Sequence, residues 1–401
     1  MIFLPKKILA IGDLANTFSV LKKFTKDYEI HLINFPWDTA SRITESDDVE
    51  FFDSLKIKDQ VRKINSIKSN YELVLVNTWA GARIAYLCGL EYILFFVGSA
   101  IRAPLFKKNP RLSYLDKPLP SLNVFERNFY KKILDNAIYC GANAEDLLQE
   151  LKKYRKKNIF KIGIPVDTEL FHPGIKPLEI KKNNFTFLSP QRIGLAKGID
   201  ILWKAIELTK TDFEVIQVKW FLGQRTAEER KINEDLIKNK PKKVRLIPVF
   251  KRNDVPRAYA GVDAIFGQLK NGLGATVERE AAMCKKPVIQ YADPKFKFQI
   301  EDKEEISPFL PHSNESEVIA ELIDKIVDSK EFREDLCEKE YNFVKKIADP
   351  VMIAKQWENL FHKMRDNKRD SKKLGFRLKL RLLYFLIINR LYLKKIRKNS
   401  F

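Results

Sequence analysis

The sequence predicts an α/β protein made of two consecutive domains, each built on a parallel β-sheet. Three observations support this prediction. Short apolar runs alternate with longer amphipathic segments along most of the 401 residues, which is the pattern of β-α-β units. A stretch rich in Pro and Gly, residues 161–183, interrupts the alternation and marks a domain boundary. Apolar residues make up 45% of the chain and charged residues 31%, as in globular proteins with a packed core.

The first domain is expected over residues 1–165. Its candidate strands are the apolar runs at 8–11, 30–33, 73–76 and 92–97. The first and last of these runs lead into Gly12 and into Gly98-Ser99. Parallel sheets bind ligands at the carboxyl ends of their strands, so these three residues are candidate ligand-side positions. Gly12 is equally well explained as a turn glycine.

The second domain is expected over residues 166–347. Its candidate strands are 185–188, 215–218, 244–247, 264–266 and 287–289, each followed by a loop and a helix. A further helix is expected over residues 348–365, and it carries Trp357 and Phe361.

Residues 366–401 form a basic tail, with twelve Lys or Arg against two Asp or Glu. On a helix, seven apolar residues of the tail fall within one uncharged arc of about 120°. They are Leu374, Leu378, Leu382, Phe385, Leu386, Leu393 and Ile396. This amphipathic pattern predicts a helix that lies on an anionic membrane surface. The alternative is a helix that docks on the protein's own core.

The net charge of +21 indicates partners that carry phosphate, such as nucleotides or anionic lipids. No recognition motif for nucleic acid accompanies this charge, so nucleic acid is not an expected partner. Four widely spaced cysteines and four isolated histidines predict neither a disulfide framework nor a metal site. Because no signal peptide or apolar run of 18 residues occurs, the expected location is cytoplasmic.

Two segments of the second domain carry candidate chemistry. Arg192 and Lys197 flank a Gly-containing loop at the end of a strand, and a guanidinium and an ammonium together suit a diphosphate. Gly272 and Gly274 precede a helix expected from about residue 275, and the start of such a helix binds phosphate. Glu280, farther along that helix, can accept hydrogen bonds from ribose hydroxyls. The alternative is that Glu278 and Glu280 are surface charges.

Four features together resemble the family 4 retaining glycosyltransferases of the GT-B fold (glycosyl transferases group 1). They are the run GIPVDTELFHP (163–173), the spacing of Arg192 and Lys197, residues 244–266, and the run EAAMCKKPVI (280–289). The resemblance covers residues 160–365 well and the first half of the chain in outline. It implies two Rossmann-like domains that face a central cleft, with residues 348–365 returning to the first domain.

By this resemblance, Arg192 and Lys197 are catalytic and bind the diphosphate of a nucleotide-sugar donor, while Glu280 binds its ribose. Gly272 and Gly274 line the end that holds the sugar. The first Glu of the family's Glu-x7-Glu motif falls at Gly272 or Asn271, and Gln268 is the candidate substitute. Gly12, Gly98 and Ser99 belong to the acceptor-side loops. There, Val97 and Ala100 replace the His and Asp of the family's turn.

The implied reaction is transfer of a sugar, with retention of configuration, to a lipid-linked or glycan acceptor at the cytosolic membrane face. It requires no metal or other cofactor, because the cations and the helix start stabilise the leaving diphosphate. Two alternatives remain: a noncatalytic scaffold of the same fold, and a nucleotide-sugar epimerase of the same fold.

Overall fold

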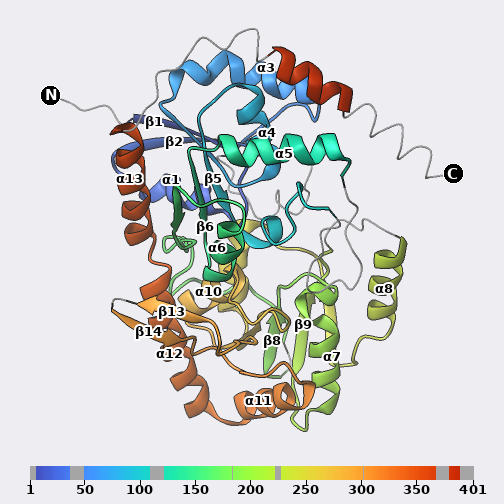
Figure 1. Ribbon diagram of the computed structural model, residues 1–401. Helices are drawn as coiled ribbons and strands as arrows, with labels where there is room; N and C mark the ends of the chain where they lie inside the picture. Colours follow the sequence, from blue (N-terminus) through green and yellow to red (C-terminus); the bar gives the residue numbers. More distant parts are fainter. Residues whose placement is uncertain are drawn as a thin grey trace. The chain divides into compact units, whose positions relative to one another are not determined.

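A computed structural model describes residues 6–36, 49–108, 122–182, 184–221, 227–300, 302–366 and 379–388. These residues form two units (Figure 1). Unit 1 contains the described residues up to Ile164 and from Val351 onward, and unit 2 contains those from Pro165 to Pro350. The predicted class, α/β with two Rossmann-like domains, is confirmed.

Unit 1 is built on a seven-stranded parallel sheet with the order β3-β2-β1-β4-β5-β6-β7. Its strands are β1 (Lys6–Ile11), β2 (Tyr28–Asn34), β3 (Glu50–Phe51), β4 (Leu73–Val76), β5 (Ile93–Phe96), β6 (Tyr139–Ala142) and β7 (Ile159–Lys161). Its helices are α1 (Thr17–Phe24), α3 (Ile57–Ile67), α4 (Trp79–Leu87), α5 (Val124–Asn136), α6 (Glu145–Lys152) and most of α13 (Pro350–Asp366), with the short 3-10 turns η1 (Lys68–Asn70) and η2 (Gly98–Ala100).

Helices cover both faces of this sheet, so its strands are buried on both sides. In β1, Leu9 and Ile11 belong to one apolar cluster, which includes residues of α4, α5 and α6. Ile8 and Ala10 belong to a second cluster, which includes residues of α1 and α13. Alternate residues of a strand point to opposite faces, which explains why the predicted strands are continuous apolar runs rather than alternating ones.

Unit 2 contains a five-stranded parallel sheet with the order β10-β9-β8-β11-β12. Its strands are β8 (Thr186–Ser189), β9 (Glu214–Val218), β10 (Val244–Ile247), β11 (Ala264–Phe266) and β12 (Val288–Ile289), with the antiparallel pair β13 (Lys297–Ile300) and β14 (Lys303–Ile306). Its helices are α7 (Ile199–Leu208), α8 (Ala227–Lys238), α9 (Val255–Ala260), α10 (Thr276–Met283), α11 (Ser316–Asp328) and α12 (Lys330–Ile347), with the 3-10 turns η3 (Leu195–Lys197) and η4 (Arg252–Asp254).

Residues 379–388 of the basic tail form a helix, drawn in red near the C-terminal end in Figure 1. Phe385 is buried, and Leu382 is partly buried against the same cluster of unit 1. The structure therefore corrects part of the membrane prediction, because these two residues of the predicted membrane-facing arc pack on the protein itself. Leu374, Leu378, Leu393 and Ile396 lie outside the described residues. Within the described part of the chain, no helix is both long and apolar enough to cross a membrane.

Candidate functional site

The candidate donor residues gather at the point where the strand order of unit 2 reverses. The sheet continues from β8 to β9 on one side and from β8 to β11 on the other. Loops that follow two such strands diverge and leave room for a ligand at their carboxyl ends. Arg192 and Lys197 follow β8, while Gln268, Gly272 and Gly274 follow β11. The fold thus brings together two segments that are about 70 residues apart in the sequence.

Lys197 ends the short turn η3, and two hydrogen-bonded contacts join it to the β11 loop. Its carbonyl accepts a hydrogen bond from the Leu269 amide at 3.0 Å, and its ammonium lies 3.4 Å from Gln268 Oε1. Gly198, with φ +74°, packs against Leu269 so closely that a Cβ atom would lie 3.1 Å from the Leu269 backbone. The two loops therefore hold each other in place.

The electrostatic surroundings of Lys197 suit an anion. Burial lowers the pKa of its ammonium, the Glu278 carboxylate opposes this shift, and the charge of Arg192 adds to it. Among the described residues, no carboxylate forms an ion pair with Lys197. The Arg192 guanidinium lies over the Trp220 ring, 5.7 Å from its centroid. An anion bound here would offset the cost of holding two cations close together.

Glu278 is fully buried and connects three segments of the site. Its Oε1 accepts hydrogen bonds from the Gln268 amide at 2.6 Å and from Gln191 Nε2 at 3.0 Å. Its Oε2 accepts one from the Ala275 amide at 2.9 Å, at the start of α10. The alternative interpretation of Glu278 as a surface charge is therefore wrong. The contact with Ala275 is local to the start of α10, whereas the contacts with Gln268 and Gln191 depend on the tertiary fold and leave no pattern in the sequence.

Glu280 is also buried, and its Oε1 forms an ion pair with Arg252 Nη2 at 2.6 Å. Arg252 begins the turn η4, and its guanidinium lies 4.6 Å from the centre of the Phe171 ring. Burial raises the pKa of the Glu280 carboxyl, and the Arg252 charge opposes this shift. The surface interpretation of Glu280 is wrong as well, whereas its contact with ribose stays a prediction.

The β11 loop contains glycines of two kinds. Gly272 has φ +63°, and a Cβ atom there would lie 2.5 Å from Asp293 Cβ, so the position requires glycine. Gly274 has more space, because a Cβ atom would lie 3.5 Å from Gln290 Oε1. Gln268 is buried, and its amide nitrogen donates to the Leu273 carbonyl. The proposed substitute for the missing Glu therefore lies inside the loop and helps to fix its shape.

In unit 1, Gly12 follows β1 with φ +79°, and a Cβ atom there would lie 2.8 Å from Thr78 Oγ1. The next residue, Asp13, is buried and accepts hydrogen bonds from the Phe18 and Ser19 amides and from Asn77 Nδ2. Burial raises the pKa of the Asp13 carboxyl, and these hydrogen bonds oppose the shift. A close approach of backbone and side chain thus accounts for Gly12 without a ligand.

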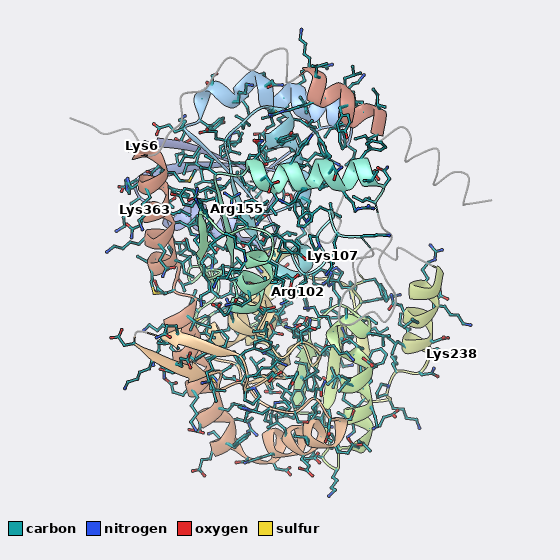
Figure 2. The ribbon with its side chains drawn as sticks, viewed as in Figure 1. Lys6, Arg102, Lys107, Arg155, Lys238 and Lys363 are labelled. Atoms are coloured by element: carbon teal, nitrogen blue, oxygen red, sulfur yellow. The ribbon has the colours of Figure 1, made fainter. Side chains whose placement is uncertain are left out.

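Gly98 and Ser99 form part of η2 after β5. Gly98 is exposed with φ +66°, and no atom lies within 4 Å of the place where a Cβ would be. The Ser99 side chain lies outside what the structure describes. Arg102, which is labelled in Figure 2, lies two residues after η2 and forms an ion pair with Asp146 of α6.

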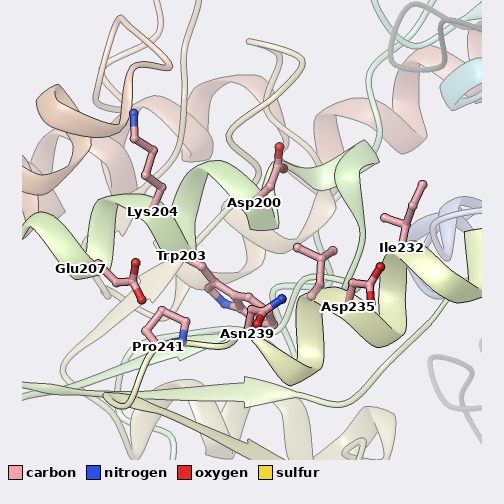
Figure 3. Close-up of a pocket in the computed structure, with 9 residues that line it drawn as sticks. Asp200, Trp203, Lys204, Glu207, Ile232, Asp235, Asn239 and Pro241 are labelled. Atoms are coloured by element: carbon pink, nitrogen blue, oxygen red, sulfur yellow. The ribbon is translucent and has the colours of Figure 1, made fainter.

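A separate pocket of about 370 Å³ lies between α7 and α8 (Figure 3). Trp203 and Pro241 line it together with Asp200, Glu207 and Asp235. This lining is mainly apolar and acidic, which does not suit a diphosphate, and none of the candidate donor residues contributes to it. Among the described residues, no three or more His, Cys, Asp or Glu side chains are grouped so that they could hold a metal ion.

Comparison with known proteins gives a family match for part of the chain and a fold for most of it. Residues 174–343 match the family of glycosyl transferases group 1. HepE of Anabaena, in complex with UDP and glucose, is 15% identical with a TM-score of 0.62, covering 89% of this chain and 100% of that chain. Sucrose-phosphate synthase of Thermosynechococcus elongatus is 15% identical with a TM-score of 0.64, covering 90% and 100%.

A putative UDP-N-acetylglucosamine 2-epimerase of Listeria monocytogenes is 13% identical with a TM-score of 0.54, covering 91% of this chain and 98% of that chain. At such identities these likenesses establish the fold alone, which is GT-B. No curated protein sequence matches the chain.

Proposed function

We propose that this chain, whose residues 174–343 match the family of glycosyl transferases group 1, moves a sugar from a nucleotide-sugar donor to a lipid-linked or glycan acceptor, with retention of configuration. Lys197 is the observation that carries this proposal. Its half-buried ammonium has a lowered pKa and, among the described residues, no carboxylate in an ion pair with it. Such a cation beside the start of a helix is suited to a phosphate.

The chain's own residues supply charge stabilisation in this reaction. As the bond between the sugar and the diphosphate breaks, negative charge grows on the diphosphate, and Lys197, Arg192 and the amide groups at the start of α10 stabilise it. Glu278 acts as a positioning residue, because it joins both loops to that helix start. The hydroxyl group of the acceptor attacks the sugar from the same face that the diphosphate leaves. The departing diphosphate takes the proton of that hydroxyl group. No metal or other cofactor is part of this scheme.

The proposed donor is a uridine diphosphate sugar, since HepE, a protein of the same fold, is described in complex with UDP and glucose. The proposed acceptor side includes the loops at Gly12 and at Gly98-Ser99, which follow β1 and β5 of unit 1. The proposed location is the cytoplasmic face of a membrane, where the basic tail binds anionic lipid.

Incubation of the full-length protein with a panel of nucleotide-sugars and a lipid extract tests the proposal. Mass spectrometry should show an acceptor that gains one sugar residue, and Lys197→Ala should remove this product. Binding of a nucleoside diphosphate with no sugar transfer would support the noncatalytic scaffold instead. Conversion of the donor to an isomer without any acceptor would support the epimerase.

A further inference from the structure

The helix of residues 379–388 has two apolar faces, of which one is packed and one is not. On the packed face, the Phe385 ring lies 5.1 Å from the Phe129 ring of α5, centroid to centroid. The Arg83 guanidinium of α4 lies 5.2 Å from the centre of the Phe385 ring. Arg381 donates a hydrogen bond to the Tyr86 carbonyl at 3.3 Å. These contacts attach the helix to α4 and α5 of unit 1.

The opposite face exposes four large apolar side chains. They are Leu380, Leu383, Tyr384 and Ile387, which are 48%, 54%, 39% and 51% exposed. Their spacing of three, four and seven residues puts all four on one stripe of the helix. We call these residues the outer stripe. A docked helix needs only one apolar face for its packing. The packing on α4 and α5 therefore does not account for the outer stripe, which is exposed for contact with another surface.

Two further exposed apolar side chains lie at the start of α5. Phe125, which is 57% exposed, precedes Phe129 by one helical turn and therefore lies on the same side of α5 as the contact with Phe385. Val124 beside it is 50% exposed. Lys132, three residues after Phe129, is exposed as well. The helix on which the tail helix docks thus carries exposed apolar side chains and an exposed cation of its own.

The basic residues that flank the outer stripe in the sequence indicate which kind of surface it binds. Lys379 is exposed at the start of the helix. The sequence contains five basic residues in 367–378 and five more in 389–401, with Asp370 as the one acidic residue in these two segments. An apolar stripe between clusters of cations is complementary to a bilayer, whose anionic headgroups lie above an apolar interior.

We propose that the outer stripe inserts into the interface of an anionic bilayer, while Phe385 keeps the helix attached to unit 1. Attachment through Phe385 and Leu382 means that the inserting residues are not those of the arc predicted from the sequence. The docked helix would hold unit 1, with its acceptor-side loops, at the membrane surface. This inference names the residues that make the membrane contact of the proposed function. Only the biological role of that contact, which is to bring unit 1 to an acceptor in the membrane, rests on the proposed function.

Flotation of the full-length protein with vesicles tests the inference. The vesicles contain phosphatidylcholine with about 30% phosphatidylglycerol, and no donor is added. The double variant Leu383→Ser/Ile387→Ser should bind these vesicles about ten-fold more weakly than the wild type, because apolar area no longer enters the interface. The matched control is Leu208→Ser, which changes a leucine of α7 in unit 2 that is 45% exposed. The control should bind like the wild type, and unchanged melting of both variants shows that they are folded.

Two results would overturn the inference. One is equal vesicle binding by the double variant and the wild type. The other is a wild-type protein that dimerises through this face, shown by light scattering, with a double variant that is monomeric but still binds vesicles. In that case a second copy of the chain covers the outer stripe. Because no donor is present, the outcome does not depend on sugar transfer, so failure here and failure of the proposed function are distinguishable.

Discussion

Glu278 and Glu280 are two positions apart on α10, yet they contact different parts of unit 2. Glu278 accepts hydrogen bonds from both loops of the donor site, whereas Glu280 pairs with Arg252. The sequence indicated Arg192 and Lys197 through their spacing at the end of a strand, and Glu280 through its place on the helix after the Gly272-Gly274 loop. It did not indicate Glu278 or Arg252, because a buried hydrogen bond to a distant segment leaves no local pattern.

Replacement of Lys197 by Ala should raise the dissociation constant for uridine diphosphate by about ten-fold or more. The change removes a charge-assisted contact of about 1.5–3 kcal/mol. Titration calorimetry measures the effect. Lys204→Ala is the matched control, because Lys204 is an exposed lysine of α7 that forms an ion pair with Glu317 at 3.0 Å. Equal affinity of the wild type and the Lys197 variant would remove Lys197 from the site.

Glu278→Gln should weaken both the fold of the donor loops and the binding of uridine diphosphate. The amide keeps one acceptor oxygen but turns an NH₂ group toward backbone N–H donors, which leaves buried donors unpaired at a cost of about 1–3 kcal/mol. Thermal unfolding and calorimetry should change together. Glu317→Gln, at an exposed carboxylate of α11, should change neither. A Glu278→Gln protein with wild-type stability would contradict the positioning role.

Glu280→Gln should lower the free energy of unfolding by several kcal/mol, since it leaves the buried Arg252 guanidinium without its counter-charge. Chemical denaturation measures the loss. The double variant Arg252→Met/Glu280→Met should recover much of it, because an apolar pair of similar size carries no unpaired charge. If the double variant is less stable than Glu280→Gln, the ion pair is not the cause.

At the scale of elements, hydrophobic runs were sufficient to predict β1, β2, β4 and β5 of unit 1 and all five parallel strands of unit 2, but not β3, β6, β7 or the pair β13 and β14. The runs at 8–11 and 73–76 became β1 and β4. β6 was missed because Tyr139–Ala142 is short and contains Gly141, a residue that weakens a strand pattern. That glycine has a tertiary cause: a Cβ atom there would lie 2.2 Å from the Phe160 ring of β7. β13 and β14 were missed because neither is an apolar run: KFQI begins with Lys and contains Gln, and three of the four residues of KEEI are charged.

The docking of the tail helix, residues 379–388, should contribute to the stability of unit 1. Phe385→Ala should lower the free energy of unfolding by up to about 3 kcal/mol, because it removes the buried ring that packs on Phe129. Ile387→Ala, on the exposed face of the same helix, should change stability by no more than about 0.5 kcal/mol. Urea denaturation followed by tryptophan fluorescence distinguishes them. Equal effects of the two variants would show that the helix does not dock through Phe385.

At the scale of the whole molecule, the two units differ in how the chain builds them. Of the described residues, those of unit 2 all fall between Pro165 and Pro350, whereas unit 1 also requires residues from Val351 onward. These later residues belong to α13, whose Trp357 is fully buried. Its ring packs within 5.0 Å of the Phe95 ring and 5.5 Å of the Phe160 ring, centroid to centroid. The core of unit 1 is therefore completed by residues that follow unit 2 in the sequence.

This difference predicts opposite behaviour of two fragments. Residues 165–350 should fold alone and bind uridine diphosphate, because their sheet, their apolar clusters and both donor loops lie within that range. Residues 1–164 should not fold stably, because without α13 the surface covered by Trp357 and Phe361 is exposed, and an apolar surface of that size drives aggregation. Calorimetric unfolding and light scattering of the two fragments provide the measurement. Covalent attachment of residues 348–366 to fragment 1–164 through a flexible linker should restore a cooperative transition. A cooperative transition of 1–164 without that segment would show that α13 is not part of the core.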